Sequence, residues 1–195
     1  MRRAALALVL LTLAACTHAQ PAADSGASVA SEDSLHPALA PLAGLLGTWE
    51  GPATAMTQAG PQELWQTEEV RTELGGRLVV VEGTGRERGE DGALGEVVFN
   101  AFGIFSVDAQ TGTVYFDAFT MEGRHTRVAP AFVEGGFDWG MDVENGPLVR
   151  YQMRFDEAGR WVETGRVSMD TGGTWMDFFE MTLDRVEPDA EPDAE

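Results

Sequence analysis

Lysine is absent from the sequence, and cysteine and histidine are scarce, with one cysteine and three histidines among 195 residues. A single cysteine cannot form a disulfide within the chain, so the folded part must depend on its core. His18, His36 and His125 are too scattered to form a zinc site with Cys16. The sequence also lacks a phosphate-binding loop, an HExxH motif and a GxSxG nucleophile elbow. We therefore assign no catalytic residue and no metal ligand.

Positive charge is scarce as well. Arginine supplies all 13 basic side chains, which stand against 32 acidic residues and leave a formal net charge of −19. Nucleic acids and anionic lipid headgroups would repel such a surface. The composition therefore excludes a nucleic-acid partner, and a surface suited to solubility is the simplest interpretation.

Long apolar runs are also missing. The apolar stretch 4–13 is shorter than the about 20 residues that span a bilayer. It follows Arg2 and Arg3 and precedes Leu13-Ala14-Ala15-Cys16, which resembles the lipobox of bacterial lipoproteins. The resemblance implies that Cys16 is acylated and anchors the exported protein in the cell envelope, at the periplasmic face of the outer membrane. The alternative is cleavage after a small residue such as Ala19, which would discard Cys16.

Composition divides the chain into four parts. Residues 1–16 form the signal, and residues 17–35, rich in Ala, Ser, Asp and Pro, are typical of a flexible tether. Residues 36–186 are long enough for one domain with a real core. Residues 187–195 are an acidic, proline-containing tail.

The domain is predicted to be all-β. Runs rich in β-branched and aromatic residues alternate with turn-forming residues. Leu39, Leu42 and Leu46 indicate one short helix within 36–46. The simplest arrangement is a single closed, antiparallel, up-and-down barrel of about ten strands with an N-terminal plug helix, because closure leaves no exposed edge. The ten strands follow from nine turn signals, at residues 58–61, 75–76, 89–92, 108–112, 122–123, 135–136, 144–146, 156–159 and 170–173.

A Gly-x-Trp motif follows the expected helix, in Gly47-Thr48-Trp49-Glu50-Gly51. With this motif, the turn spacing and Arg185 near the domain's end, residues 36–186 resemble bacterial lipocalin-like (calycin-type) domains of unknown function. In that group the helix plugs one barrel end and an arginine covers the tryptophan, which adds a cation–π contact. The group carries no settled activity.

Haem-binding barrels such as nitrobindin share the Gly-x-Trp-x-Gly opening, so a haem protein is an alternative. In those proteins more glycines follow and a late histidine binds iron. Here Pro52 follows Gly51, and no histidine lies beyond His125. We therefore expect no cofactor.

Strand alternation suggests which side chains line the barrel. We expect Glu69, Glu82, Glu163 and Glu180 inside, joined by Arg150, because buried charges need partners. This network would either anchor the head of a ligand or fill the barrel as a structural element.

The favoured function is a non-enzymatic binder of a small, partly apolar ligand. The alternatives are a cofactorless hydrolase or isomerase and a structural envelope protein. Residues 94–107 and 175–180 are apolar on both strand faces, so we also expect an outward apolar surface that would suit a homodimer.

Overall fold

The computed structural model describes residues 35–187. The predicted acylation at Cys16, the signal and nearly all of the tether and acidic tail lie outside this range. Within it, no helix is long and apolar enough to span a membrane.

The described part is all-β apart from the 3₁₀ helix η2 (Pro37–Leu45). Long runs of β-branched and aromatic residues form the strands, and Gly- and Asp-containing turns separate them. Residues 35–187 contain eleven strands: β1 (Gly47–Thr57), β2 (Gly60–Glu73), β3 (Leu78–Arg88), β4 (Leu94–Val107), β5 (Val114–Thr120), β6 (His125–Val128), β7 (Ala131–Val133), β8 (Gly136–Asp142), β9 (Leu148–Phe155), β10 (Trp161–Ser168) and β11 (Met176–Val186).

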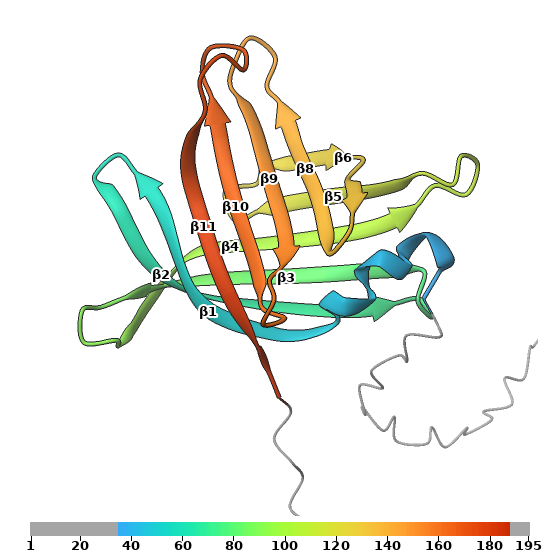
Figure 1. Ribbon diagram of the computed structural model, residues 1–195, viewed down its shortest axis with the longest axis horizontal. Coiled ribbons are helices and arrows are strands. Elements are labelled where there is room, and N and C mark those ends of the chain that lie inside the picture. Colours follow the sequence, from blue (N-terminus) through green and yellow to red (C-terminus); the bar gives the residue numbers. More distant parts are fainter. Residues whose placement is uncertain (1–34, 188–195) are drawn as a thin grey trace, which may run out of the picture.

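All the strands belong to one antiparallel sheet of order β6-β5-β4-β3-β2-β1-β11-β10-β9-β8-β7. Strands that are consecutive in the sequence pair, except β6 and β7, and β1 also pairs with β11, as in Thr48↔Val186. The sheet curls so that β8–β11 cross over β2–β5 (Figure 1). This brings two halves of one sheet face to face around a common core.

The barrel is open, and the prediction of a closed barrel of ten strands was wrong. All nine predicted turns separate strands, but a further break at Ala129-Pro130 divides the expected sixth strand into β6 and β7. These two strands are the edges of the sheet. They are only four and three residues long, and proline has no N–H to donate to a ladder. The sheet therefore ends at β6 and β7 instead of closing.

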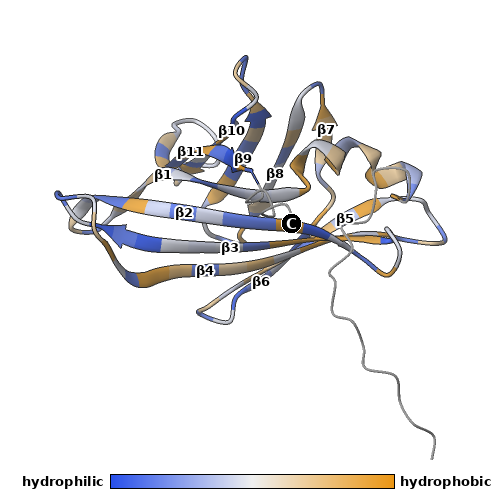
Figure 2. Ribbon diagram, turned by 90° about the horizontal axis from the view of Figure 1, so that it is seen from below, coloured by the Kyte–Doolittle hydropathy of each residue, from blue (hydrophilic) through white to orange (hydrophobic). Residues whose placement is uncertain are grey.

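Side chains hold the two halves together. The ring centroids of Phe105 and Phe137 lie 5.4 Å apart, and those of Phe116 and Trp139 lie 5.1 Å apart. At the open side, Thr126 Oγ1 of β6 donates to Met141 Sδ of β8 at 3.6 Å. Figure 2 shows hydrophobic residues concentrated along β4, whereas β2 carries hydrophilic stretches. The core is thus continuous across the opening between the edge strands.

Helix η2 covers part of this core, as predicted for residues 36–46. Leu39, Leu42 and Leu45 are buried, and their spacing of three matches the three residues per turn of a 3₁₀ helix. Trp49 Nε1 donates a 2.7 Å hydrogen bond to Leu45 O. Arg185 donates to Leu46 O and places its guanidinium carbon 5.0 Å from the Trp49 ring centroid. The predicted arginine cover over the tryptophan is therefore present.

Candidate functional site

The two faces of β2 differ sharply. Leu64, Gln66, Glu68 and Val70 are buried, whereas the residues between them are half-buried or exposed. Leu64 and Val70 belong to the hydrophobic core, so this set faces the interior. Gln66 and Glu68 are consequently two polar side chains on the inner face of the sheet.

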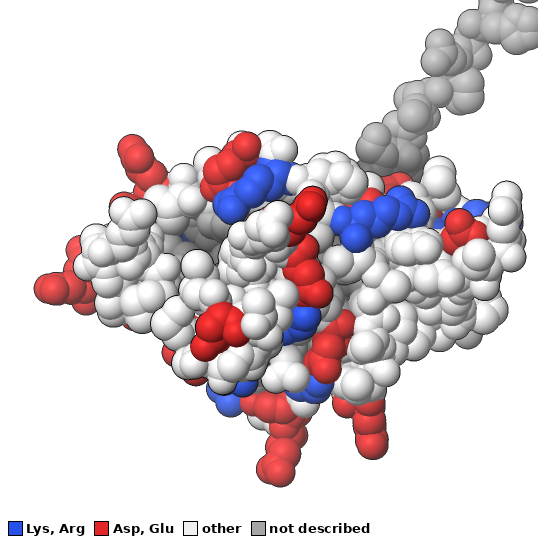
Figure 3. Space-filling model, turned by 90° about the horizontal axis from the view of Figure 1, so that it is seen from above, with Lys and Arg blue, Asp and Glu red and all other residues white. Residues whose placement is uncertain are grey.

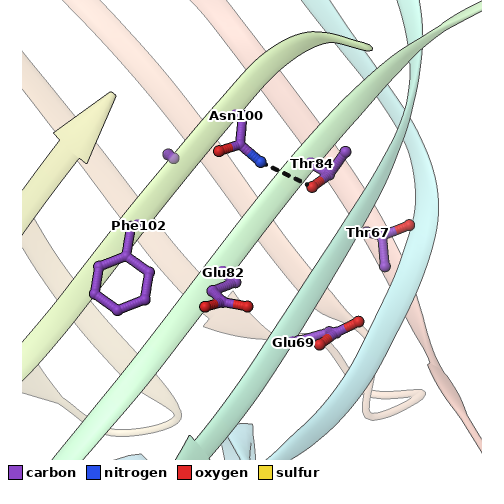
Figure 4. Close-up of a pocket in the computed structure, with 7 residues that line it drawn as sticks. Thr67, Glu69, Glu82, Thr84, Asn100 and Phe102 are labelled. Atoms are coloured by element: carbon purple, nitrogen blue, oxygen red, sulfur yellow. Dashed lines mark hydrogen bonds between the residues drawn. The ribbon is translucent and has the colours of Figure 1, made fainter. Parts of the chain in front are cut away.

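Glu69 and Glu82, predicted inside, lie on the outer face. They are cross-strand partners on β2 and β3. Glu82 pairs with the exposed Arg71 at 3.1 Å. Both acids line an outer groove of about 320 Å³, in which Asn100 Nδ2 donates to Thr84 Oγ1 at 3.1 Å (Figure 4). The prediction shifted both strands by one residue, and such a shift moves every side chain to the opposite face.

Arg150 and Glu180 are also outside, so the predicted interior network is wrong. Arg150 forms a 2.6 Å ion pair with Asp142, and its side chain is 42% exposed. Glu180 is exposed on β11, where Met181 and Leu183 supply buried core residues. On the face drawn in Figure 3, acidic side chains and arginines lie near one another at the surface.

Glu163, by contrast, lies inside as predicted. It follows Trp161 by two residues on β10, and both residues are buried. Trp161 Nε1 donates to Glu163 Oε2 at 3.3 Å, and the Trp139 side chain on β8 also hydrogen-bonds Glu163. Two indole N–H groups from separate strands therefore orient this carboxyl.

Glu68 and Gln66 form the second half of the interior polar cluster, and the prediction missed both. Gln66 Nε2 donates to Glu68 Oε1 at 2.8 Å. Gln66 is 1% exposed, and its Oε1 has no hydrogen-bond partner. The sequence contained a signal that distinguishes the two faces. Glu69 alternates with the charged Arg71, whereas Glu68 alternates with the apolar Leu64 and Val70.

Burial changes the acidity of both carboxyls. The pKa of Glu68 is raised to about 8, mainly by desolvation; a hydrogen bond from Gln66 lowers it, and the negative charge of Glu163 contributes a smaller increase. Desolvation likewise raises the pKa of Glu163 to about 7, against lowering hydrogen bonds from Trp161 and Trp139. Both acids therefore retain a proton at pH values where exposed glutamate has lost it.

Small and aromatic residues surround this cluster. A Cβ on Gly83 would lie 2.7 Å from Glu68 Oε1, and a Cβ on Gly165 would lie 2.9 Å from the Tyr151 ring. The Trp139 and Tyr151 rings stack at 4.1 Å. Burial and the charge of Glu163 raise the pKa of Tyr151. Glycine at positions 83 and 165 thus leaves room for the carboxyl and the aromatic rings.

His125, the histidine weighed as an iron ligand, lies on the outer face at the start of β6. It stacks on Phe119 with centroids 4.5 Å apart, and its Nε2 lies 2.9 Å from Asp117 Oδ1. Its imidazole therefore does not point into the core. In the part of the chain that the structure describes, no three His, Cys, Asp or Glu side chains are placed to hold a metal ion.

Both segments expected to carry an outward apolar surface expose apolar side chains: Leu94 and Val97 in 94–107, and Met176 in 175–180. Phe102 is half-buried, and Phe119, its cross-strand partner, is 39% exposed. A homodimer through this surface stays a prediction.

Comparison of the chain with protein-family models and with curated proteins found no match. The geometry of the interior cluster therefore carries the functional argument.

Proposed function

We propose that this protein is a non-enzymatic binder that holds a small, partly apolar ligand against the inner face of the curled sheet. The observation that carries the proposal is the unpartnered Oε1 of Gln66, which is buried beside the carboxyl of Glu68. A buried polar atom without a partner costs about 1–3 kcal/mol, so a ligand that satisfies it gains affinity.

The surroundings of the polar atoms suit such a ligand. Trp139, Tyr151 and Trp161 offer aromatic surface next to Glu163. Binding sites commonly combine an apolar wall with a few polar groups that orient the ligand. The edge strands β6 and β7 are not neighbours in the sheet, so the sheet is not closed on that side.

The proposal includes a location in the cell envelope. The lipobox-like Leu13-Ala14-Ala15-Cys16 supports acylation of Cys16 and attachment to the envelope. Replacing Cys16 with alanine should release the protein into the soluble periplasmic fraction, and unchanged membrane association would contradict acylation.

The binding test uses N-phenyl-1-naphthylamine, an apolar fluorophore that accepts energy from tryptophan. With the wild-type domain we expect enhanced probe emission on tryptophan excitation. Gly165→Leu should weaken probe binding about tenfold or more, because even a Cβ there would lie 2.9 Å from the Tyr151 ring and 3.0 Å from the Phe178 ring, so leucine must displace these interior rings. Circular dichroism checks that this variant is folded, and Glu69→Gln on the outer face is the matched control. Absence of probe emission in the wild type, or equal binding by folded Gly165→Leu, would contradict the interior site.

A further inference from the structure

The two interior carboxyls have no cationic partner. Among residues 35–187 there are nine ion pairs, and none includes Glu68 or Glu163. The arginines in them pair with other acids, such as Glu82 and Asp142. Buried carboxylates in proteins are normally paired, because a lone buried charge costs several kcal/mol. Burial keeps both acids protonated instead, and a bound cation would stabilise their charged form.

Once a carboxyl of the cluster has lost its proton, the remaining hydrogen-bonding capacity is that of an acceptor. The indole N–H of Trp161 and the Trp139 side chain are both engaged with Glu163. Gln66 Nε2 is engaged with Glu68, while Gln66 Oε1 is free. A ligand that completes this cluster must donate hydrogen bonds to the amide oxygen and to the carboxyl oxygens.

The aromatic side chains reinforce this preference. Trp139 and Tyr151 stack at 4.1 Å, and Trp161 packs edge-on to Trp49 at 6.1 Å. The faces of such rings attract cations, by about 2 kcal/mol or more where water is excluded. Carboxyls and aromatic faces together are the combination that recognises an organic ammonium group.

We propose that the interior ligand is an organic cation, a protonated amine carried on an apolar body, whose ammonium group lies among Glu68, Glu163 and Gln66. This inference rests on the proposed function, because it names the ligand class of the same interior site. The ammonium supplies both the missing charge and the missing donors, and the apolar body contacts the aromatic wall.

Binding should exchange a proton for the ammonium charge. Tyr151 is a titratable side chain whose pKa the charge of Glu163 raises, and the cations near Tyr151 are Arg150 and Arg166, which line a pocket with it, and Arg124, which is paired with Glu122. At pH 6 both carboxyls hold protons, and one of these protons must pass to solvent before the ammonium can pair with a carboxylate. An alkylammonium, like lysine, stays charged to about pH 10. Affinity should therefore rise between pH 6 and pH 8.5, by at most about tenfold per pH unit for each proton released.

The experiment is calorimetric titration with three probes that share one apolar body: hexylammonium, 1-hexanol and hexanoate. At pH 8 we expect hexylammonium to bind about tenfold or more tightly than 1-hexanol, and hexanoate to show no binding. Glu163→Gln and Glu68→Gln should each weaken hexylammonium about tenfold while changing 1-hexanol by less than about threefold. Either variant suffices if the other fails to fold. Glu69→Gln, one residue away on the outer face, should change neither.

Each other outcome overturns the inference in its own way. If 1-hexanol binds as tightly as hexylammonium, the cation preference fails while apolar binding in the interior stands. If hexylammonium binding survives both interior variants but is lost in Glu69→Gln, the outer groove is the amine site. If no probe binds, including N-phenyl-1-naphthylamine, the proposed function itself fails.

Discussion

Glu68 and Glu69 are consecutive residues on β2, yet their surroundings differ completely. Glu68 is buried against Gly83, bonds to Gln66 and has its pKa raised to about 8. Glu69 is exposed on the rim of the outer groove, opposite Glu82. The side chains are chemically identical, so the face of the sheet alone makes one a buried acid and the other a surface acid.

The tryptophans repeat this contrast between faces. Trp161 is 3% exposed and packs edge-on to Trp49 in the core. Trp65, on the outer face of β2, is half-buried beneath the guanidinium of Arg88, whose carbon lies 4.8 Å from the ring centroid. The Trp161 ring is thus part of the hydrophobic core, whereas the Trp65 ring lies outside it.

The largest expected effect is the loss of an inner tryptophan. Trp161→Ala should lower the free energy of unfolding by about 3–5 kcal/mol, because it leaves a cavity in the core. Trp65→Ala should cost about 1 kcal/mol, since its cation–π partner is at the surface. Urea unfolding of both variants measures the difference. Equal losses would show that the inner and outer faces do not differ in this way.

The next effect is on the pH dependence of stability. Glu68 and Glu163 bind protons more tightly in the folded chain than in the unfolded chain, since the folded pKa values are about 8 and about 7 against 4.5 for the unfolded groups. Their contribution is therefore fully present below pH 4.5 and is lost as the pH rises toward 8. The slope should reach about 1.4 kcal/mol per pH unit for each carboxyl.

Matched variants show how much of this pH dependence comes from Glu68 and Glu163. Glu68→Gln and Glu163→Gln should each flatten the decline between pH 5 and pH 8, because an amide does not titrate. Glu69→Gln should leave the curve as in the wild type. Thermal unfolding across this pH range tests all three, and a decline as steep in Glu68→Gln as in the wild type would rule out the raised pKa of Glu68 as a cause.

The smallest effect concerns the outer ion pairs. Arg71 bonds to both Glu73 and Glu82 at 3.1 Å, but all three side chains are over 40% exposed. Arg71→Gln should therefore change the free energy of unfolding by less than about 1 kcal/mol. That small loss should shrink further in 1 M salt, where screening is strong. A loss above about 2 kcal/mol, independent of salt, would mean that these exposed ion pairs stabilise the fold as much as buried core residues do.

Local patterns predicted much of the fold. The Gly- and Asp-rich turns placed nine of the strand boundaries, since glycine tolerates the positive φ that tight turns need, as at Gly112 and Gly159. The leucines at 39 and 42 and the Trp49–Arg185 contact also follow from local spacing and motif. The break at Ala129-Pro130 was missed, although a proline within a run argues against a continuous strand.

The interior site was predicted less well. Glu163 was placed correctly because Trp161 marks the inner face of β10. Glu69 and Glu82 were misplaced by one residue. Glu180 was misplaced because it alternates with Met176 and Phe178, and Arg150 because buried acids need a cationic partner. The β-bulge between Gly165 and Arg166 further disrupts alternation between β10 and β11.

The sequence by itself determined the all-β class, the turns, the short leucine-rich helix and the excess of acid, because each depends on residue type and short-range spacing. Only the tertiary structure decided the register of each strand, the opening between β6 and β7, and the meeting of Glu68 with Glu163. These depend on which face of a strand packs against distant strands. Since strand side chains alternate with a period of two, burial of Leu64 and Val70 in a core built by other strands places Glu68 inside and Glu69 outside.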